Sequence, residues 1–152
     1  MSSFVHHEMF PIRADETPYR KLTSEHVSIG KFGSETVLKI APEAITLLTA
    51  EAFHDTSHLL RPGHLQQLSN ILDDSEASDN DRFVALDLLK NANISAGGVL
   101  PMCQDTGNVI IMAKKGQKVW TGGDDEAALA AGACQAYAEN NFRYSMVALM
   151  DM

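Results

Sequence analysis

Alternating apolar and polar residues near the start of the chain predict a β-hairpin. Val27 and Ile29 flank Ser28, and a second short apolar run covers residues 37–40. Glycines lie between the two runs, where a tight turn favours them. We therefore expect two short strands joined by a turn.

Apolar residues then recur at three- to four-residue spacing, which predicts helices. Pro42 fits the first turn of one helix, and Ser78 or Asp79 can cap another. Three helices are expected, at residues 42 to about 58, 64–72, and about 79 to 91–93.

A second pair of strands is predicted further along the chain. The apolar run at residues 109–113 is long enough for a buried strand. Residues 118–121 would return beside it as the second strand of the pair.

The last predicted helix is rich in alanine. Asp124 or Asp125 can cap it, and residues 127–138 have a strongly helix-forming composition. Small residues such as Gly132 predict close packing against a neighbouring element. Cys134 is expected to lie in the core.

Hairpins and short strands combined with clustered helices indicate an α+β, helix-rich domain. The chain of 152 residues is long enough for one domain with its own core. We expect an N-terminal arm over residues 1–20 and the domain over residues 21–152. Residues 146–152 form an apolar run without a terminator, so the domain is expected to be incomplete at its C-terminus.

Composition and charge limit the kinds of partner and the cellular compartment that we expect. The chain is 45% hydrophobic, with a net charge of −8 and a pI near 5.1, which argues against nucleic acids and anionic membranes as partners. Its two cysteines do not make a disulfide framework, which favours a reducing compartment. No signal peptide is visible, and no apolar run approaches the roughly 18–20 residues of a membrane span. A cytoplasmic protein is expected.

The densest polar chemistry lies in residues 97–107. Cys103, Gln104, Asp105 and Thr106 follow one another without a gap. All four could face one ligand only if the backbone turns sharply, which the flanking glycines and a proline favour. The alternative is that Cys103 is a small buried hydrophobe beside an Asx-type turn.

Histidines and one arginine are further candidates. His54 and His58 are four residues apart and would share a helix face, but the HExxH pattern is absent, so structural or surface roles are expected. His6 and His7 are expected to be solvated. Arg143 could form a forked pair with a substrate carboxylate, or could pair with a surface acid.

The order of residues from 99 to 107, Val-Leu-Pro-Met-Cys-Gln-Asp-Thr-Gly, resembles the class I, iron–sulfur-dependent fumarate hydratases. More blocks follow in the family's order, and the resemblance covers about residues 17–152. The other similar blocks are residues 22–27, 52–55, 114–117, 119–123, 125–129 and 140–145.

The resemblance implies a 4Fe–4S cluster held by three cysteine thiolates, with one iron open to act as a Lewis acid on the substrate. Cys103 matches the first of the three cysteines. Gln104 and Asp105 match positions that contact the dicarboxylate, and Arg143 matches an arginine that pairs with a substrate carboxylate. Cys134 does not match a ligand position.

In the family, the other two cluster cysteines and the catalytic base lie beyond the stretch that this chain matches. The resemblance therefore implies the N-terminal portion of a hydro-lyase that interconverts fumarate and (S)-malate, inactive alone, with no catalytic acid or base assigned here. It also implies a homodimer at full length. The alternatives are a related hydro-lyase such as tartrate dehydratase, a truncated non-catalytic fragment or regulatory partner, and a zinc-binding module.

Overall fold

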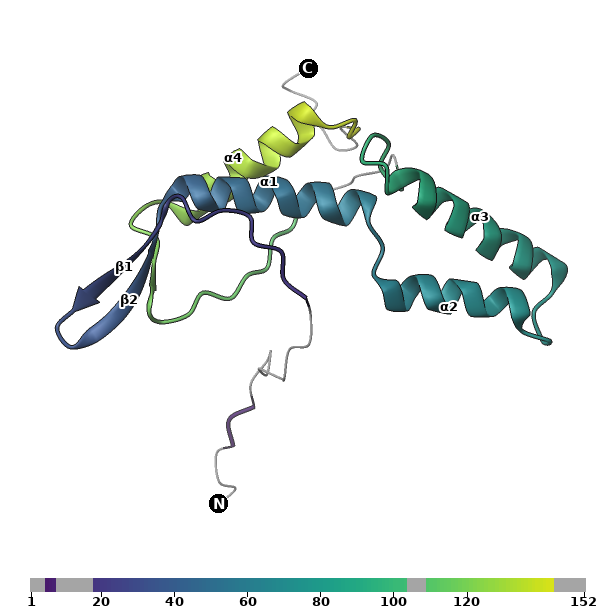
Figure 1. Ribbon diagram of the computed structural model, residues 1–152, viewed down its shortest axis with the longest axis horizontal. Coiled ribbons are helices and arrows are strands. Elements are labelled where there is room, and N and C mark those ends of the chain that lie inside the picture. Colours follow the sequence, from purple (N-terminus) through teal and green to yellow (C-terminus); the bar gives the residue numbers. More distant parts are fainter. Residues whose placement is uncertain (1–4, 8–17, 104–108, 144–152) are drawn as a thin grey trace.

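The computed structural model describes residues 5–7, 18–103 and 109–143 (Figure 1). Helices dominate, and a small sheet lies at one end of the molecule, so the α+β prediction is confirmed. The elements in chain order are β1 (Val27–Phe32), β2 (Glu35–Ile40), α1 (Pro42–His58), α2 (Pro62–Asp73), α3 (Asp79–Ser95), β3 (Val119–Trp120) and α4 (Asp125–Glu139).

The predicted N-terminal hairpin is confirmed. β1 and β2 pair antiparallel, with Phe32 opposite Glu35 next to the turn. Gly33 has a φ of +59°, a left-handed conformation that glycine adopts without a steric penalty. The hairpin therefore forms where the alternation and the glycine predicted it.

The second predicted strand pair is wrong. β3 pairs with β2 in parallel, with Leu38 opposite Val119, and residues 109–114 form no strand. The side chains of Ile110 and Met112 are 76% and 83% exposed. An apolar run indicates a strand only if an edge is available to pair with it, and the local pattern does not specify that partner.

The closest helix contact joins α1 to α4. Gly132 of α4 lies against the α1 backbone, and a Cβ atom built on it would lie 2.4 Å from the Thr46 carbonyl oxygen and 2.6 Å from Thr49 Cβ. The Thr46 hydroxyl also donates a hydrogen bond to the Ala128 carbonyl at 3.1 Å. The predicted close packing of the small residues is confirmed.

The expectation that Cys134 lies in the core is wrong, because its side chain is exposed. The buried face of α4 is formed by Ala128, Gly132, Ala133 and Ala136. Two residues along a helix correspond to a rotation of about 200°, so Cys134 points away from the face that holds Gly132 and Ala136.

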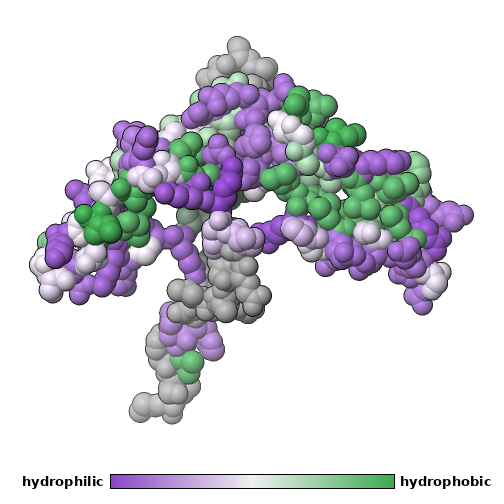
Figure 2. Space-filling view, in the orientation of Figure 1, coloured by the Kyte–Doolittle hydropathy of each residue, from purple (hydrophilic) through white to green (hydrophobic). Residues whose placement is uncertain are grey.

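The helices α2 and α3 pack on each other as a hairpin that extends from the end of α1 (Figure 1). Leu68 and Ala92 are buried between them, and Leu65 and Ile71 are half-buried. Larger apolar side chains of α3, including Phe83 and Leu86, remain exposed. Figure 2 shows a broad apolar patch over this hairpin.

The start of α3 is fixed by a capping box. The Ser78 hydroxyl accepts a hydrogen bond from the Asp81 amide at 3.2 Å, and the Asp81 carboxylate accepts one from the Ser78 amide at 2.9 Å. The Ser78 side chain and then its backbone amide hold the pKa of Asp81 below its usual range. The alternative caps are thereby resolved in favour of Ser78, and Asp124 is the cap of α4.

Within the described ranges, no helix has the length and apolar character needed to cross a membrane.

Replacing Gly132 with Ala should destabilise the protein by about 1–3 kcal/mol, because the added methyl group collides with the α1 backbone. The range is a net effect: the methyl group meets backbone atoms, so the collision outweighs the gain of ~1 kcal/mol that alanine brings to a helix interior. Gly63→Ala in α2 is the matched control, since its Cβ would meet no atom within 4 Å. Thermal and urea unfolding measure both, and a Gly132→Ala variant as stable as Gly63→Ala would contradict the packing.

Replacing Ser78 with Ala should raise the pKa of Asp81 toward its ordinary value. Because the folded pKa lies below the unfolded one, the capping box stabilises the fold above the ordinary carboxyl pKa. That stabilisation is lost as the pH falls through the lowered folded value. An NMR titration of the Asp81 carboxyl group in both proteins tests this, and identical titration curves would contradict it.

Candidate functional site

The site is built around an irregular segment that follows α3. We call residues 97–103 the cysteine segment. Gly97 and Gly98 donate backbone hydrogen bonds to Ile94 and Ser95 as the helix ends, at 3.1 and 2.8 Å. Gly98 then adopts a φ of +73°, which turns the chain over the ring of His54. The end of α3 therefore directs the segment toward the end of α1.

Hydrogen bonds from three parts of the chain hold the backbone of the cysteine segment. The Met102 amide donates to the Ser57 carbonyl at 2.9 Å, and the Asn91 side chain donates to the Met102 carbonyl at 2.8 Å. The Asn141 side chain donates to the Val99 carbonyl at 2.9 Å. The cysteine segment is not part of a helix or a sheet, so residues of α1, α3 and the chain after α4 provide hydrogen-bond partners for its backbone.

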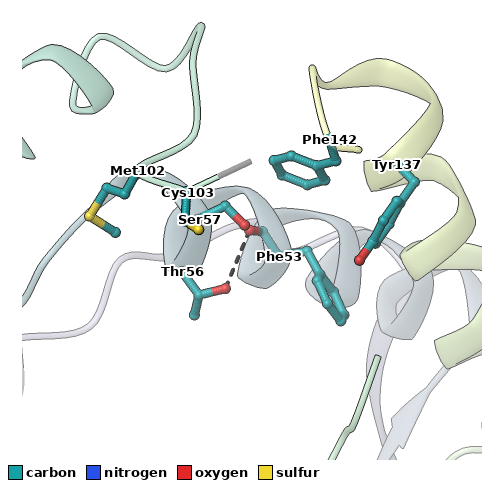
Figure 3. Close-up of a pocket in the computed structure, with 7 residues that line it drawn as sticks. All are labelled: Phe53, Thr56, Ser57, Met102, Cys103, Tyr137 and Phe142. Atoms are coloured by element: carbon teal, nitrogen blue, oxygen red, sulfur yellow. Dashed lines mark hydrogen bonds between the residues drawn. The ribbon is translucent and has the colours of Figure 1, made fainter. Parts of the chain in front are cut away.

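The Cys103 side chain is exposed and lines a pocket of about 270 Å³ between α1 and the end of α4 (Figure 3). The hypothesis of a small buried hydrophobe is therefore wrong. Aromatic rings form much of the pocket wall, so the thiol lies beside apolar surface and is still accessible. The other lining residues are Phe53, Thr56, Ser57, Met102, Tyr137 and Phe142.

The two helical histidines lie next to the pocket, because the His58 ring contacts its lining residue Phe142. The rings of His54 and His58 stack with centroids 4.4 Å apart, and the ring of His58 lies 5.8 Å from Phe142. His58 is 1% exposed, and its Nδ1 lies 2.8 Å from the His54 carbonyl oxygen. A carbonyl oxygen only accepts, so Nδ1 carries the proton. The buried His58 has the structural role that was expected of it.

Among the described residues, no group of three or more histidines, cysteines and acidic residues is placed to hold a metal ion. His54 contacts Asp55 at 3.5 Å, and both His6 and His7 are exposed. The histidines therefore give no support to a zinc-binding module in this part of the chain.

The other predicted site residues are only partly described. Arg143 is exposed and directly follows Phe142, a wall of the pocket. Gln104 and Asp105 lie outside the described residues, as do Thr106 and Gly107. The structure thus brings Cys103 and the chain leading into Arg143 to the same pocket.

Comparisons with known proteins show the family to which the chain belongs. The structure by itself defines an α+β domain in which Cys103 is exposed beside a pocket. The sequence profile described as fumarate hydratase (Fumerase) matches residues 46–152. The chain belongs to the fumarate hydratase family.

The curated relatives include bacterial and protozoan enzymes. The chain is 56% identical over 149 residues to the aerobic class I fumarate hydratase of Salmonella typhimurium, and 59% identical over 143 residues to that of Escherichia coli. It is 52% identical over 132 residues to the mitochondrial fumarate hydratase 1 of Leishmania major. These matches cover 98%, 94% and 86% of the chain, but only 26%, 26% and 24% of the relatives. The chain thus spans about a quarter of the length of the relatives it matches.

Proposed function

We propose that this chain is the N-terminal portion of an enzyme that interconverts fumarate and (S)-malate by reversible hydration. Family membership supports this reaction, and the relatives are named for it. The observation that carries the proposal for the site is the exposed Cys103 thiol beside an aromatic pocket. The activity requires the remaining part of the protein, so the chain alone is expected to be inactive.

Cys103 fits one ligand of a 4Fe–4S cluster. Iron–sulfur clusters are held by cysteine thiolates, and a ligand must be accessible to the group it binds. Cys103 meets this requirement, whereas the described residues offer no second cysteine in the same pocket. We infer that two further thiolates come from other parts of the full-length protein.

The polar residues near Cys103 are assigned to the substrate. Gln104 and Asp105 would contact the dicarboxylate, and the Arg143 guanidinium would pair with one carboxylate in a forked geometry. Phe53, Tyr137 and Phe142 would limit the access of water from the pocket side. When bound, the cluster would supply a Lewis-acidic iron that helps the substrate hydroxide to leave. No catalytic acid or base is assigned among this chain's residues.

The wider context is also part of the proposal. Residues 1–20 would form an arm, and residues 21–152 would be part of the iron–sulfur domain. Two cysteines, both free of disulfides, are usual in a reducing compartment, which supports a cytoplasmic enzyme. We further propose a homodimer at full length, on the basis of the family resemblance.

Replacing Cys103 with Ala in the full-length protein should abolish cluster binding and lower the fumarate hydratase activity by more than about 100-fold. The loss of a direct ligand is expected to exceed the 10–100-fold that outer-sphere partners contribute. Anaerobic purification, iron and sulfide content, and visible absorbance measure the cluster. Cys134→Ala is the control, because this cysteine is also exposed but does not line the pocket. Normal iron content and activity in Cys103→Ala would overturn the assignment.

The full-length enzyme should turn over fumarate with a higher kcat/KM than tartrate. The relatives are named for fumarate, and a site built for that substrate would desolvate the second hydroxyl of tartrate without giving it a partner. Steady-state rates with both substrates on one anaerobic preparation give the ratio. A higher kcat/KM for tartrate would identify the protein as a related dehydratase. The assignment of Cys103 as a cluster ligand would still stand.

A further inference from the structure

We propose that Asn91 and Asn141 are positioning residues for Cys103. Their side-chain amides hold the backbone of the cysteine segment so that the thiol faces the pocket. The consequence for a cluster rests on the function proposed above, whereas the orientation of the thiol does not.

The Asn91 bond acts on the peptide that leads into Cys103. The Met102 carbonyl and the Cys103 amide belong to one planar peptide unit, so fixing the carbonyl oxygen fixes the plane from which the Cys103 Cα departs. Asn91 Nδ2 holds that oxygen at 2.8 Å. The Met102 amide is held by Ser57 at 2.9 Å, so both sides of this residue are anchored to helices.

The Asn141 bond joins two parts of the site that are far apart in sequence. Its Nδ2 atom holds the Val99 carbonyl at 2.9 Å, across 42 residues. The next residue, Phe142, is buried against the pocket and precedes Arg143. One hydrogen bond therefore sets the spacing between the chain that carries the thiol and the chain that carries the arginine.

Both asparagines are exposed, so these bonds are not required merely to satisfy buried groups. A single exposed amide–carbonyl bond contributes little to global stability, because water replaces it when it is lost. Loss of either bond should therefore alter the position of Cys103 more than it alters the stability of the fold.

The test replaces each asparagine with aspartate in the full-length protein. Aspartate keeps the shape of the side chain but has no amide donor, and its charge repels the carbonyl oxygen. Asn93→Asp is the matched control, since it makes the same charge change on α3 at a side chain that lines the groove between α2 and α3. Asn91→Gln keeps an amide donor and should therefore retain part of the positioning of Cys103 that Asn91→Asp loses.

The first measurement is the alkylation rate of Cys103 in the cluster-free protein, relative to that of Cys134 in the same sample. Peptide mass spectrometry separates the two cysteines. We expect the ratio to change in Asn91→Asp and Asn141→Asp but to keep its wild-type value in Asn93→Asp, with similar melting temperatures. An unchanged ratio in either variant would overturn the assignment of that residue. Should Asn91→Asp not fold, Asn91→Ala, which also lacks the amide donor, decides for that residue by the same ratio.

The second measurement is the rate of cluster loss to an iron chelator, after anaerobic reconstitution. Residues that orient a metal ligand typically contribute about 10–100-fold in metal affinity, so the two variants should lose the cluster about 10-fold faster or more. A rate equal to that of Asn93→Asp would contradict the role toward the cluster. If the reconstituted wild-type protein held no cluster, the proposed function would be refuted. The proposal for the asparagines would not be, because the alkylation ratio tests the position of Cys103 independently.

Discussion

The close approach of α4 to α1 at Gly132 sets the spacing of the two helices that form the walls of the pocket. It places the small face of α4 on the α1 backbone near Thr46 and Thr49. From this contact the two helices run on to the pocket, where α1 supplies Phe53 and Ser57 and α4 supplies Tyr137. A larger residue at position 132 would separate the helices, and the walls of the pocket would separate with them.

A second contact links the site to the α2–α3 hairpin. The Ser95 hydroxyl donates to the His58 carbonyl at 2.9 Å, and both residues are fully buried. This bond joins the last residue of α1 to the last residue of α3. The cysteine segment begins next to this junction, so its starting position is fixed. The rest of the α2–α3 hairpin extends away from the site. The junction is polar: the Ser95 hydroxyl is satisfied, whereas the buried Nε2 atom of His58 has no hydrogen-bond partner among the described residues.

Local signals in the sequence were sufficient for most of the elements. Pro42, the Ser78 cap and the Asp124 cap marked helix starts because each acts on its own first turn. The strand at residues 109–114 and the burial of Cys134 were predicted wrongly, because each depends on which distant element lies opposite. Cys103 stood out by its neighbours in the chain. Asn91 and Asn141 did not, since an asparagine near a helix end has an ordinary explanation and their partners are 11 and 42 residues away.

The arrangement also explains how an irregular segment can hold an exposed cysteine in a defined position. Backbone amides and carbonyls need partners, and in a loop the loop's own polar side chains commonly provide them. Here the Val99 and Met102 carbonyls and the Met102 amide are satisfied by groups from outside the segment. The Cys103 side chain remains exposed at the pocket. The anchoring comes from α1, α3 and Asn141 after α4, and the segment places Cys103 at the pocket.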